Sequence, residues 1–321
     1  MKNPKIAVVG AGPVGCIMTA YLSRGGNEVA VIDVVKPYLE KILADGIRLE
    51  GFTSFDAKVA RTFDSVEGAA KIGAKFDVVF ICVKAPVNQL IAAALPSIIG
   101  EGGAVAVCQN GIDTEAPILA SCGPSRTLRG VVNYAGNAKG PGQIHMTFFN
   151  GVNYLGAAVR GDTAAEAKAK DVAALMSAAQ LTTEFSDDVQ RFVWTKGIRN
   201  AALMPISALT GKDIADVMES PTSFRLLEHL LKEQLAVAAS IGYAFDGKFY
   251  DDTLAYYRKA GHHMPSMYDD VINHRQTEIG YLNHRIAEVG EQNGVPVPYN
   301  RAMANLVICL DEVAASRKMR P

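Results

Sequence analysis

A glycine-rich turn near the start of the sequence constrains the fold more than any other feature. Gly10, Gly12 and Gly15 directly follow the apolar run Ile6–Val9 and open a helical pattern over residues 14–24. In such a strand–turn–helix unit the glycines allow a tight turn and a close approach of the backbone to a pyrophosphate, which the helix N-terminus then holds. The pattern predicts a cofactor-binding turn made of Gly10, Ala11, Gly12, Pro13, Val14 and Gly15.

The apolar runs of the first half predict a parallel sheet. Val29–Ile32, Val78–Ile81 and Ala104–Val107 are continuous β-branched stretches separated by helical segments, as a sheet buried on both faces requires. Further on, a Gly-Pro-Gly turn at residues 140–142 separates two strand-like stretches, 129–134 and 143–148. We expect these two stretches to extend the sheet in antiparallel fashion.

The second half of the sequence is predicted to be mainly helical. An alanine-rich helix is expected over residues 164–180, and beyond residue 187 almost no strand signal remains. Helices at the 3.6-residue period are expected over 188–209, 222–241, 254–259, 269–293 and 300–318. We therefore expect an α/β fold: a Rossmann-like doubly wound domain over residues 1–187 and an all-helical substrate and catalytic domain over residues 188–321.

Composition narrows the class of protein. With 321 residues, 49% of them hydrophobic, the chain is long enough for two packed cores. A formal net charge of −1 without a basic run favours a small-molecule partner over nucleic acid or a membrane surface. No stretch approaches the roughly 20 apolar residues of a membrane span, and the start lacks a signal-peptide pattern, so we expect a cytoplasmic protein.

The sequence predicts neither a disulfide framework nor a metal site from its cysteines and histidines. The five cysteines are scattered and lack a Cys-x-x-Cys pair, which argues against a disulfide framework or a zinc site. We expect inert, buried thiols at Cys82 and Cys108. The adjacent His262 and His263 have no ligand-like partner spacing, so no metal is proposed.

Asp33 bears on the choice of cofactor. It stands at the end of the second apolar run, at the spacing expected of the acid that binds the adenosine ribose hydroxyls. A carboxylate about 4 Å from the 2′-phosphate of NADP would cost on the order of 1–4 kcal/mol. We expect NAD to be preferred, with NADP as the alternative because Lys36 can offset part of this repulsion.

Lys196 is the candidate proton donor for reducing a carbonyl, because the oxygen needs a proton as hydride reaches the carbon. Asn200 lies four residues further on, one helical turn away on the same face, where it can bind substrate or orient the ammonium group. A solvated helix face is the alternative, but apolar residues at 192–194 precede the pair.

These motifs, taken in order, resemble the ketopantoate reductase (2-dehydropantoate 2-reductase) family almost end to end. The glycine turn comes first, the Lys196…Asn200 pair second, and the stretch from Pro265-Ser266-Met267 to Arg275-Gln276-Thr277-Glu278 third. The resemblance implies NAD(P)H-dependent reduction of a 2-oxo acid to an (R)-2-hydroxy acid, as in pantothenate biosynthesis. It implies an arginine for NADP near position 33, where this chain has Asp33.

The resemblance also assigns further site residues. Lys84 and Asn110, each after a predicted strand, would lie beside the nicotinamide ribose and the reacting carbon. Ser266 would bind the substrate carboxylate, and Glu278 would contact the cofactor or support the lysine. From the residues alone, Lys84 could be a solvated lysine, Asn110 part of an Asn-Gly turn and Ser266 a helix N-cap.

Three positions depart from the family pattern. Where the family has asparagines that hold the hydroxyl side of ketopantoate, this chain has Met204, Ile214 and His263. A pocket that loses such donors favours apolar bulk at that end of the substrate.

Two other interpretations stay open. A β-hydroxyacid dehydrogenase also pairs a glycine turn with Lys-x-x-x-Asn, but residues 187–194 lack the glycine-rich run those enzymes carry before the lysine. A non-catalytic NAD(P)-binding sensor is the other alternative. A short-chain dehydrogenase would need Tyr-x-x-x-Lys, which the sequence lacks. Either a monomer or a homodimer is expected.

Overall fold

The computed structural model describes residues 3–318 and forms two compact units. The N-terminal unit comprises the chain up to Gln109 together with Thr114–Phe192, and the C-terminal unit comprises Asn110–Asp113 together with residues from Val193 onward. The sequence places the domain change at residue 187, before helix α7 (Val189–Thr210), whereas the chain passes between the units inside that helix. The short segment 110–113 was not expected to leave the first unit.

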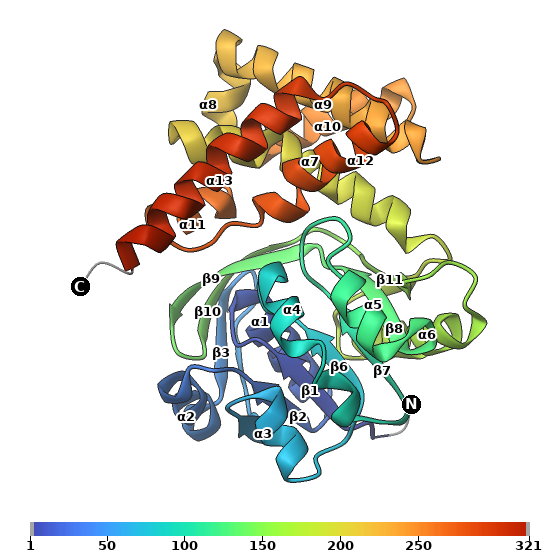
Figure 1. Ribbon diagram of the computed structural model, residues 1–321. Helices are drawn as coiled ribbons and strands as arrows, with labels where there is room; N and C mark the ends of the chain where they lie inside the picture. The colour runs from blue at the N-terminus through green and yellow to red at the C-terminus, as the bar shows by residue number, and fades with distance from the viewer. Residues whose placement is uncertain (1–2, 319–321) are drawn as a thin grey trace. The chain divides into compact units, whose positions relative to one another are not determined.

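An eight-stranded sheet forms the centre of the N-terminal unit, in the order β12-β11-β8-β7-β6-β1-β2-β5 (Figure 1). Its strands are β1 (Ile6–Val9), β2 (Val29–Ile32), β5 (Arg61–Phe63), β6 (Phe76–Ile81), β7 (Ile99–Val107), β8 (Thr127–Val131), β11 (Asn153–Ala157) and β12 (Thr183–Phe185). The six strands β5, β2, β1, β6, β7 and β8 are parallel to one another, and β11 pairs with β8 in antiparallel fashion. The predicted parallel sheet is confirmed.

Both faces of this sheet are buried, which explains the continuous apolar runs. Ile6 and Val8 pack on the side of helices α1 (Pro13–Arg24) and α6 (Thr163–Ala178). Ala7 and Val9 pack on the opposite side, in a core shared with α3 (Val66–Lys71) and α5 (Ala116–Cys122). Helices α2 (Lys36–Asp45) and α4 (Asn88–Ile91) also belong to this unit. The predicted alanine-rich helix is α6.

The expected antiparallel extension by residues 129–148 is wrong in part. Residues 129–131 belong to β8, which lies parallel to β7 in the main sheet. A hairpin forms instead between β9 (Tyr134–Gly140) and β10 (Gln143–Phe149), which join β3 (Ile47–Gly51) and β4 (Phe55–Ala57) in a second sheet. In β10 the residues alternate between exposed and buried, so this strand can bury only one face, which packs on α1. Such a strand does not suit a sheet that is covered on both sides.

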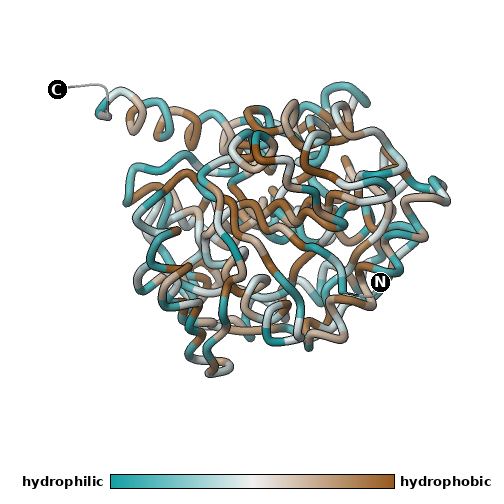
Figure 2. The backbone as a smooth tube through the Cα atoms, turned by 90° about the horizontal axis from the view of Figure 1, so that it is seen from below, coloured by the Kyte–Doolittle hydropathy of each residue, from teal (hydrophilic) through white to brown (hydrophobic). Residues whose placement is uncertain are grey.

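Within its described residues, the regular secondary structure of the C-terminal unit is all helical. After α7 come α8 (Ile214–Glu219), α9 (Pro221–Ser240), α10 (Gly247–Ala260), α11 (Ser266–Ile272), the 3-10 turn η4 (Ile279–Tyr281), α12 (Asn283–Gln292) and α13 (Pro298–Lys318). In Figure 2 the last turns of α13, beside the C-terminal label, alternate between hydrophilic and hydrophobic colours, as expected for a helix with one apolar stripe. No helix among residues 3–318 is long and apolar enough to cross a bilayer.

The single helix expected over residues 269–293 is wrong. Helix α11 ends at Ile272, and His274 adopts a positive φ of 52°, a left-handed conformation that typically ends a helix. Residues 273–278 then form a loop before η4 and α12. Ser266 and Glu278 therefore lie on different elements.

Candidate active site

The glycine turn has the geometry that the sequence predicts for a dinucleotide cradle. Gly10 has a φ of +110°, and a Cβ there would lie 2.7 Å from the Val83 nitrogen. A Cβ on Gly15 would lie 1.9 Å from the Gly10 carbonyl oxygen, so strand and helix pack at their closest here. Around Gly12, the N-cap of α1, no heavy atom of the described residues lies within 4 Å of a would-be Cβ. The turn is thus open on the side where a pyrophosphate would approach the helix N-terminus.

Asp33 lies against this turn. Its Oδ2 accepts a hydrogen bond of 2.7 Å from the Ala11 amide, and its Oδ1 accepts one of 3.0 Å from the Val35 amide. Since a carboxylate has about four acceptor sites, it can also accept from ribose hydroxyls. Lys36, the first residue of α2, pairs with Asp64 at 3.3 Å.

Residues after β6 complete the N-terminal part of the candidate site. Cys82 and Val83 contact the glycine turn, and Lys84 follows them as an exposed residue at the start of a 3-10 turn. A hydrogen bond with Cys108 and burial raise the pKa of the Cys82 thiol, and burial raises the pKa of Cys16 to about 12. These thiols are therefore protonated at neutral pH and are poor nucleophiles.

Helix α7 carries the candidate catalytic residues. Lys196, Asn200 and Met204 recur every four residues, so they share one face of the helix. Lys196 and Asn200 are half-buried, whereas Met204 is buried. Pro205 lies inside the helix.

The segment 110–113 packs on the same helix. A Cβ on Gly197, the neighbour of Lys196, would lie 3.0 Å from Ile112 Cγ1, so glycine permits this close packing. The Ile112 amide donates to the Tyr281 carbonyl oxygen at 2.8 Å, and Arg285 Nε lies 2.6 Å from Asp113 Oδ2. The structure therefore brings the Asn110 segment and the Lys196 helix together within the C-terminal unit.

Two of the three residues that depart from the family pattern, Ile214 and His263, lie next to each other. The Ile214 amide donates to the His263 carbonyl oxygen at 3.2 Å, so the chain before α11 crosses the start of α8. His262 bonds Asp213, the N-cap of α8, at 2.9 Å, and this hydrogen bond raises the pKa of His262. Ile214 is buried and the His263 residue is exposed.

Ser266 and Glu278 stand at opposite ends of the α11 region. Ser266 is the exposed first residue of α11, and the N-cap is Pro265, so the N-cap interpretation of Ser266 is wrong. Glu278 is buried at the start of η4. Its neighbour Thr277 donates from its amide and its hydroxyl to the Asp311 carboxylate, at 3.1 and 2.8 Å.

Several supporting residues escaped the sequence analysis. Gly197 could have been found, because a glycine inside a helix costs about 1 kcal/mol relative to alanine and usually marks close packing. Ile112, Asn88 and Asn283 had no such signal, since each is an ordinary residue whose partner is distant in the chain. Among residues 3–318, no cluster of His, Cys, Asp or Glu is suited to a metal ion.

A glycine turn with an acid at the end of the second strand, followed by a helical unit with Lys196 and Asn200, defines a nicotinamide-dependent oxidoreductase of the Rossmann type. Residues 6–160 match the family described as ketopantoate reductase PanE/ApbA, and residues 188–310 match its C-terminal domain. The chain belongs to the ketopantoate reductase family.

Individual proteins agree with this assignment. The chain is 26% identical over 307 residues to the 2-dehydropantoate 2-reductase of Archaeoglobus fulgidus, covering 96% of this chain and 98% of that protein. It resembles D-mandelate dehydrogenase in complex with NADH and anilino(oxo)acetate, with a TM-score of 0.86, 26% identity and coverage of 97% and 99%. It is equally similar to the PanE/ApbA family ketopantoate reductase of Ralstonia eutropha JMP134, with a TM-score of 0.85, 25% identity and coverage of 97% and 99%.

Proposed function

We propose that the protein reduces a 2-oxo acid to an (R)-2-hydroxy acid with a reduced nicotinamide cofactor, and that Lys196 supplies the proton. One observation carries this proposal: the Lys196 helix is packed, through Gly197 and Ile112, on the segment that begins with Asn110. A candidate proton donor and a candidate nicotinamide contact thus lie on two segments that pack closely on each other. Family membership supports the reaction class, and this packing supports the choice of residues.

The glycine turn is suited to the cofactor. Its positive-φ glycine, the open side of Gly12 and the start of α1 together provide main-chain amides for a pyrophosphate. Asp33 would accept from the adenosine ribose, while Lys84 and Asn110 would hold the nicotinamide ribose. When bound, the reduced nicotinamide supplies the hydride that reaches the carbonyl carbon.

NADH is the cofactor we expect to be preferred. The carboxylate of Asp33 would repel a 2′-phosphate, and Lys36 is engaged with Asp64. The next residues, Val34 and Val35, are exposed at 80% and 48%, and their side chains offer no hydrogen-bond donor to a phosphate. NADH is also the cofactor in the similar D-mandelate dehydrogenase complex.

The proton follows from charge balance. As hydride adds to the carbon, the carbonyl oxygen gains negative charge, and the Lys196 ammonium both stabilises that charge and donates the proton that makes the hydroxyl. Asn200, one turn further along α7, would donate to the same oxygen or to the carboxylate. Ser266 would bind the carboxylate, and Glu278 would orient the lysine or contact the cofactor.

The substrate is expected to carry apolar bulk beyond its 2-oxo acid group. Met204 and Ile214 offer no hydrogen bond to a hydroxyl, and the hydrogen bond from Ile214 uses the main-chain oxygen of His263. Each additional buried methylene contributes about 0.8 kcal/mol, so a few suffice to reorder substrates. Mandelate, the substrate named for the similar dehydrogenase, is an aryl 2-hydroxy acid, which supports an apolar pocket here too.

Oxidation of NADH and of NADPH, followed by absorbance with a panel of 2-oxo acids, tests the proposal. We expect branched-alkyl and aryl 2-oxo acids to match or exceed ketopantoate in kcat/KM, with an (R)-configured product on chiral chromatography. If ketopantoate is tenfold better than every apolar 2-oxo acid, the apolar-pocket proposal is wrong while the reaction class stands. If no 2-oxo acid is reduced, the reaction class itself is wrong.

A further inference from the structure

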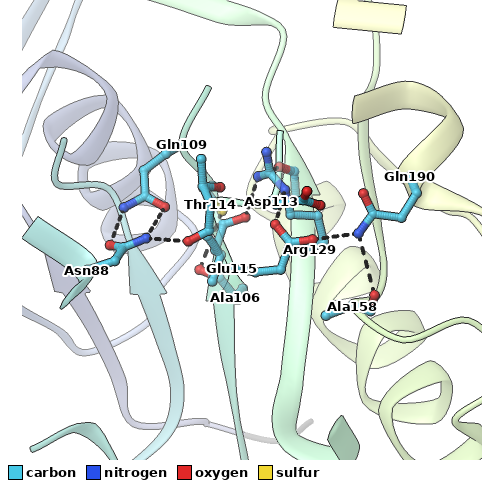
Figure 3. Close-up of polar contacts among 12 residues, drawn as sticks. Asn88, Ala106, Gln109, Asp113, Thr114, Glu115, Arg129, Ala158 and Gln190 are labelled. Atoms are coloured by element: carbon cyan, nitrogen blue, oxygen red, sulfur yellow. Dashed lines mark hydrogen bonds and ion pairs between the residues drawn. The ribbon is translucent and has the colours of Figure 1, made fainter. Parts of the chain in front are cut away.

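Asn88 is a fully buried asparagine whose side-chain amide makes three hydrogen bonds to the two residues that flank one short stretch of chain. It is the first residue of α4, with 0% of its surface exposed. Its Nδ2 donates to Gln109 Oε1 at 3.1 Å and to the Thr114 carbonyl oxygen at 2.8 Å, and its Oδ1 accepts from Gln109 Nε2 at 2.5 Å. Figure 3 shows this cluster, with the two amide groups facing each other.

The two partners of Asn88 flank the segment 110–113. Gln109 is the last residue of the N-terminal unit before the segment, and Thr114 is the first residue after it. Both are buried. Asn88 therefore fastens, within the N-terminal unit, the points at which the chain leaves and returns.

The segment itself is fastened separately, by the Ile112 and Asp113 bonds in the C-terminal unit. Asn110 is bonded directly to Gln109, and Gly111 follows with a φ of +109°, so little chain separates the fixed base from the Asn110 side chain. A buried amide with two donors and one acceptor satisfied has a single orientation. Neither an aspartate nor an apolar residue could replace it, because neither donates two hydrogen bonds.

We propose that Asn88 is a positioning residue, which sets the place of Asn110 through Gln109 and Thr114. This inference rests on the proposed function, in which Asn110 contacts the nicotinamide half of the cofactor. Asn88 acts on hydride-transfer geometry through Asn110 and touches neither substrate nor cofactor.

A double-mutant cycle between Asn88→Ala and Asn110→Ala tests the proposal in the full-length protein. We expect Asn88→Ala to lower kcat by about 10-fold to 100-fold, since small misplacements of binding groups cost up to about 100-fold. In the Asn110→Ala background the same substitution should change kcat by less than about twofold, because the residue through which it acts is gone. Gln109→Met removes the reciprocal amide pair from the other side and should reproduce the effect, which covers the case that Asn88→Ala does not fold.

Asn153→Ala is the matched control. Asn153 is 1% exposed and also binds the chain at two points of the N-terminal unit, donating to the Thr182 carbonyl oxygen and accepting from the Asn133 amide. We expect the Asn153→Ala variant to have a lower melting temperature than the wild type and a nearly unchanged kcat. Equal effects of Asn88→Ala in both backgrounds, a normal kcat for Asn88→Ala, a normal Asn110→Ala enzyme, or an equally impaired Asn153→Ala enzyme would each overturn the proposal.

The wild-type assay separates this inference from the proposed function. If the wild-type protein reduces no 2-oxo acid, the proposed function fails, and the cycle is then measured on NADH dissociation constants from the fluorescence of the bound cofactor. Non-additive losses of NADH affinity would still support Asn88 as a positioning residue. Additive losses, or none, would overturn it.

Discussion

A proline inside helix α7 makes the stability of the protein depend on one buried side chain, Asn283. Pro205 lies inside α7 and has no N–H to donate to the carbonyl oxygen of Ala201, four residues before it. Asn283, the first residue of α12, donates to that oxygen from Nδ2 at 2.8 Å. Both Ala201 and Asn283 are 0% exposed, so water cannot replace the bond.

The substitution Asn283→Leu removes this donor and keeps the number and branching of the side-chain heavy atoms. An orphaned buried acceptor costs about 1–3 kcal/mol. Part of that cost is offset, because Asn283 Oδ1 is itself buried without a hydrogen-bond partner among the described residues and disappears in the variant. The further bond to Asn300 Oδ1, at 3.0 Å, joins two side chains, and we count only the main-chain acceptor. We expect the free energy of unfolding to fall by about 1–2 kcal/mol.

Urea unfolding followed by tryptophan fluorescence measures this change in the relevant unit. Trp194 is the only tryptophan of the chain, is 4% exposed and belongs to the C-terminal unit. In a Pro205→Ala background the helix regains its own donor to Ala201, so Asn283→Leu should then cost less than about 0.5 kcal/mol. An equal cost in both backgrounds would refute the reasoning that Asn283 compensates for the proline.

Three further predictions concern activity and pH. Lys196→Ala should lower kcat by about 100-fold to 10,000-fold, because general acid catalysis contributes factors of this size, with NADH affinity nearly unchanged; near-normal turnover would exclude Lys196 as the proton donor. Asp33→Arg should raise kcat/KM for NADPH relative to NADH by at least about tenfold, given the roughly 1–4 kcal/mol of the charge pair; a wild-type preference for NADPH would contradict the premise. Burial raises the pKa of Asp311 above its ordinary 3.8, so its contribution to stability is present below the unfolded pKa and is lost as pH rises through the folded pKa. In pH-dependent urea unfolding, the stability of the wild type relative to Asp311→Asn should therefore decrease as the pH rises above the ordinary pKa of 3.8, and an increase would contradict this sign.

The sequence alone was enough to predict the class of protein, the parallel sheet and the candidate residues of the site. These features are local: the glycine turn follows its own strand, the buried strands carry continuous apolar runs, and Lys196 and Asn200 share a helix face through their spacing alone. Family motifs extended this reading to Ser266 and Glu278, whose roles stay predictions.

Tertiary structure decided what depends on partners distant in the chain. The hairpin of β9 and β10 joins β3 instead of the main sheet. Strand β10 has one buried face, and the structure, not the strand's own sequence, determines that this face packs on α1. The loop at residues 273–278 interrupts a pattern that is helical by composition, with Asp311 binding Thr277 from another helix. Asn88 and Asn283 look like any other asparagines in the sequence. Their importance comes from burial, which removes water as an alternative hydrogen-bond partner, and burial is a property of the folded chain.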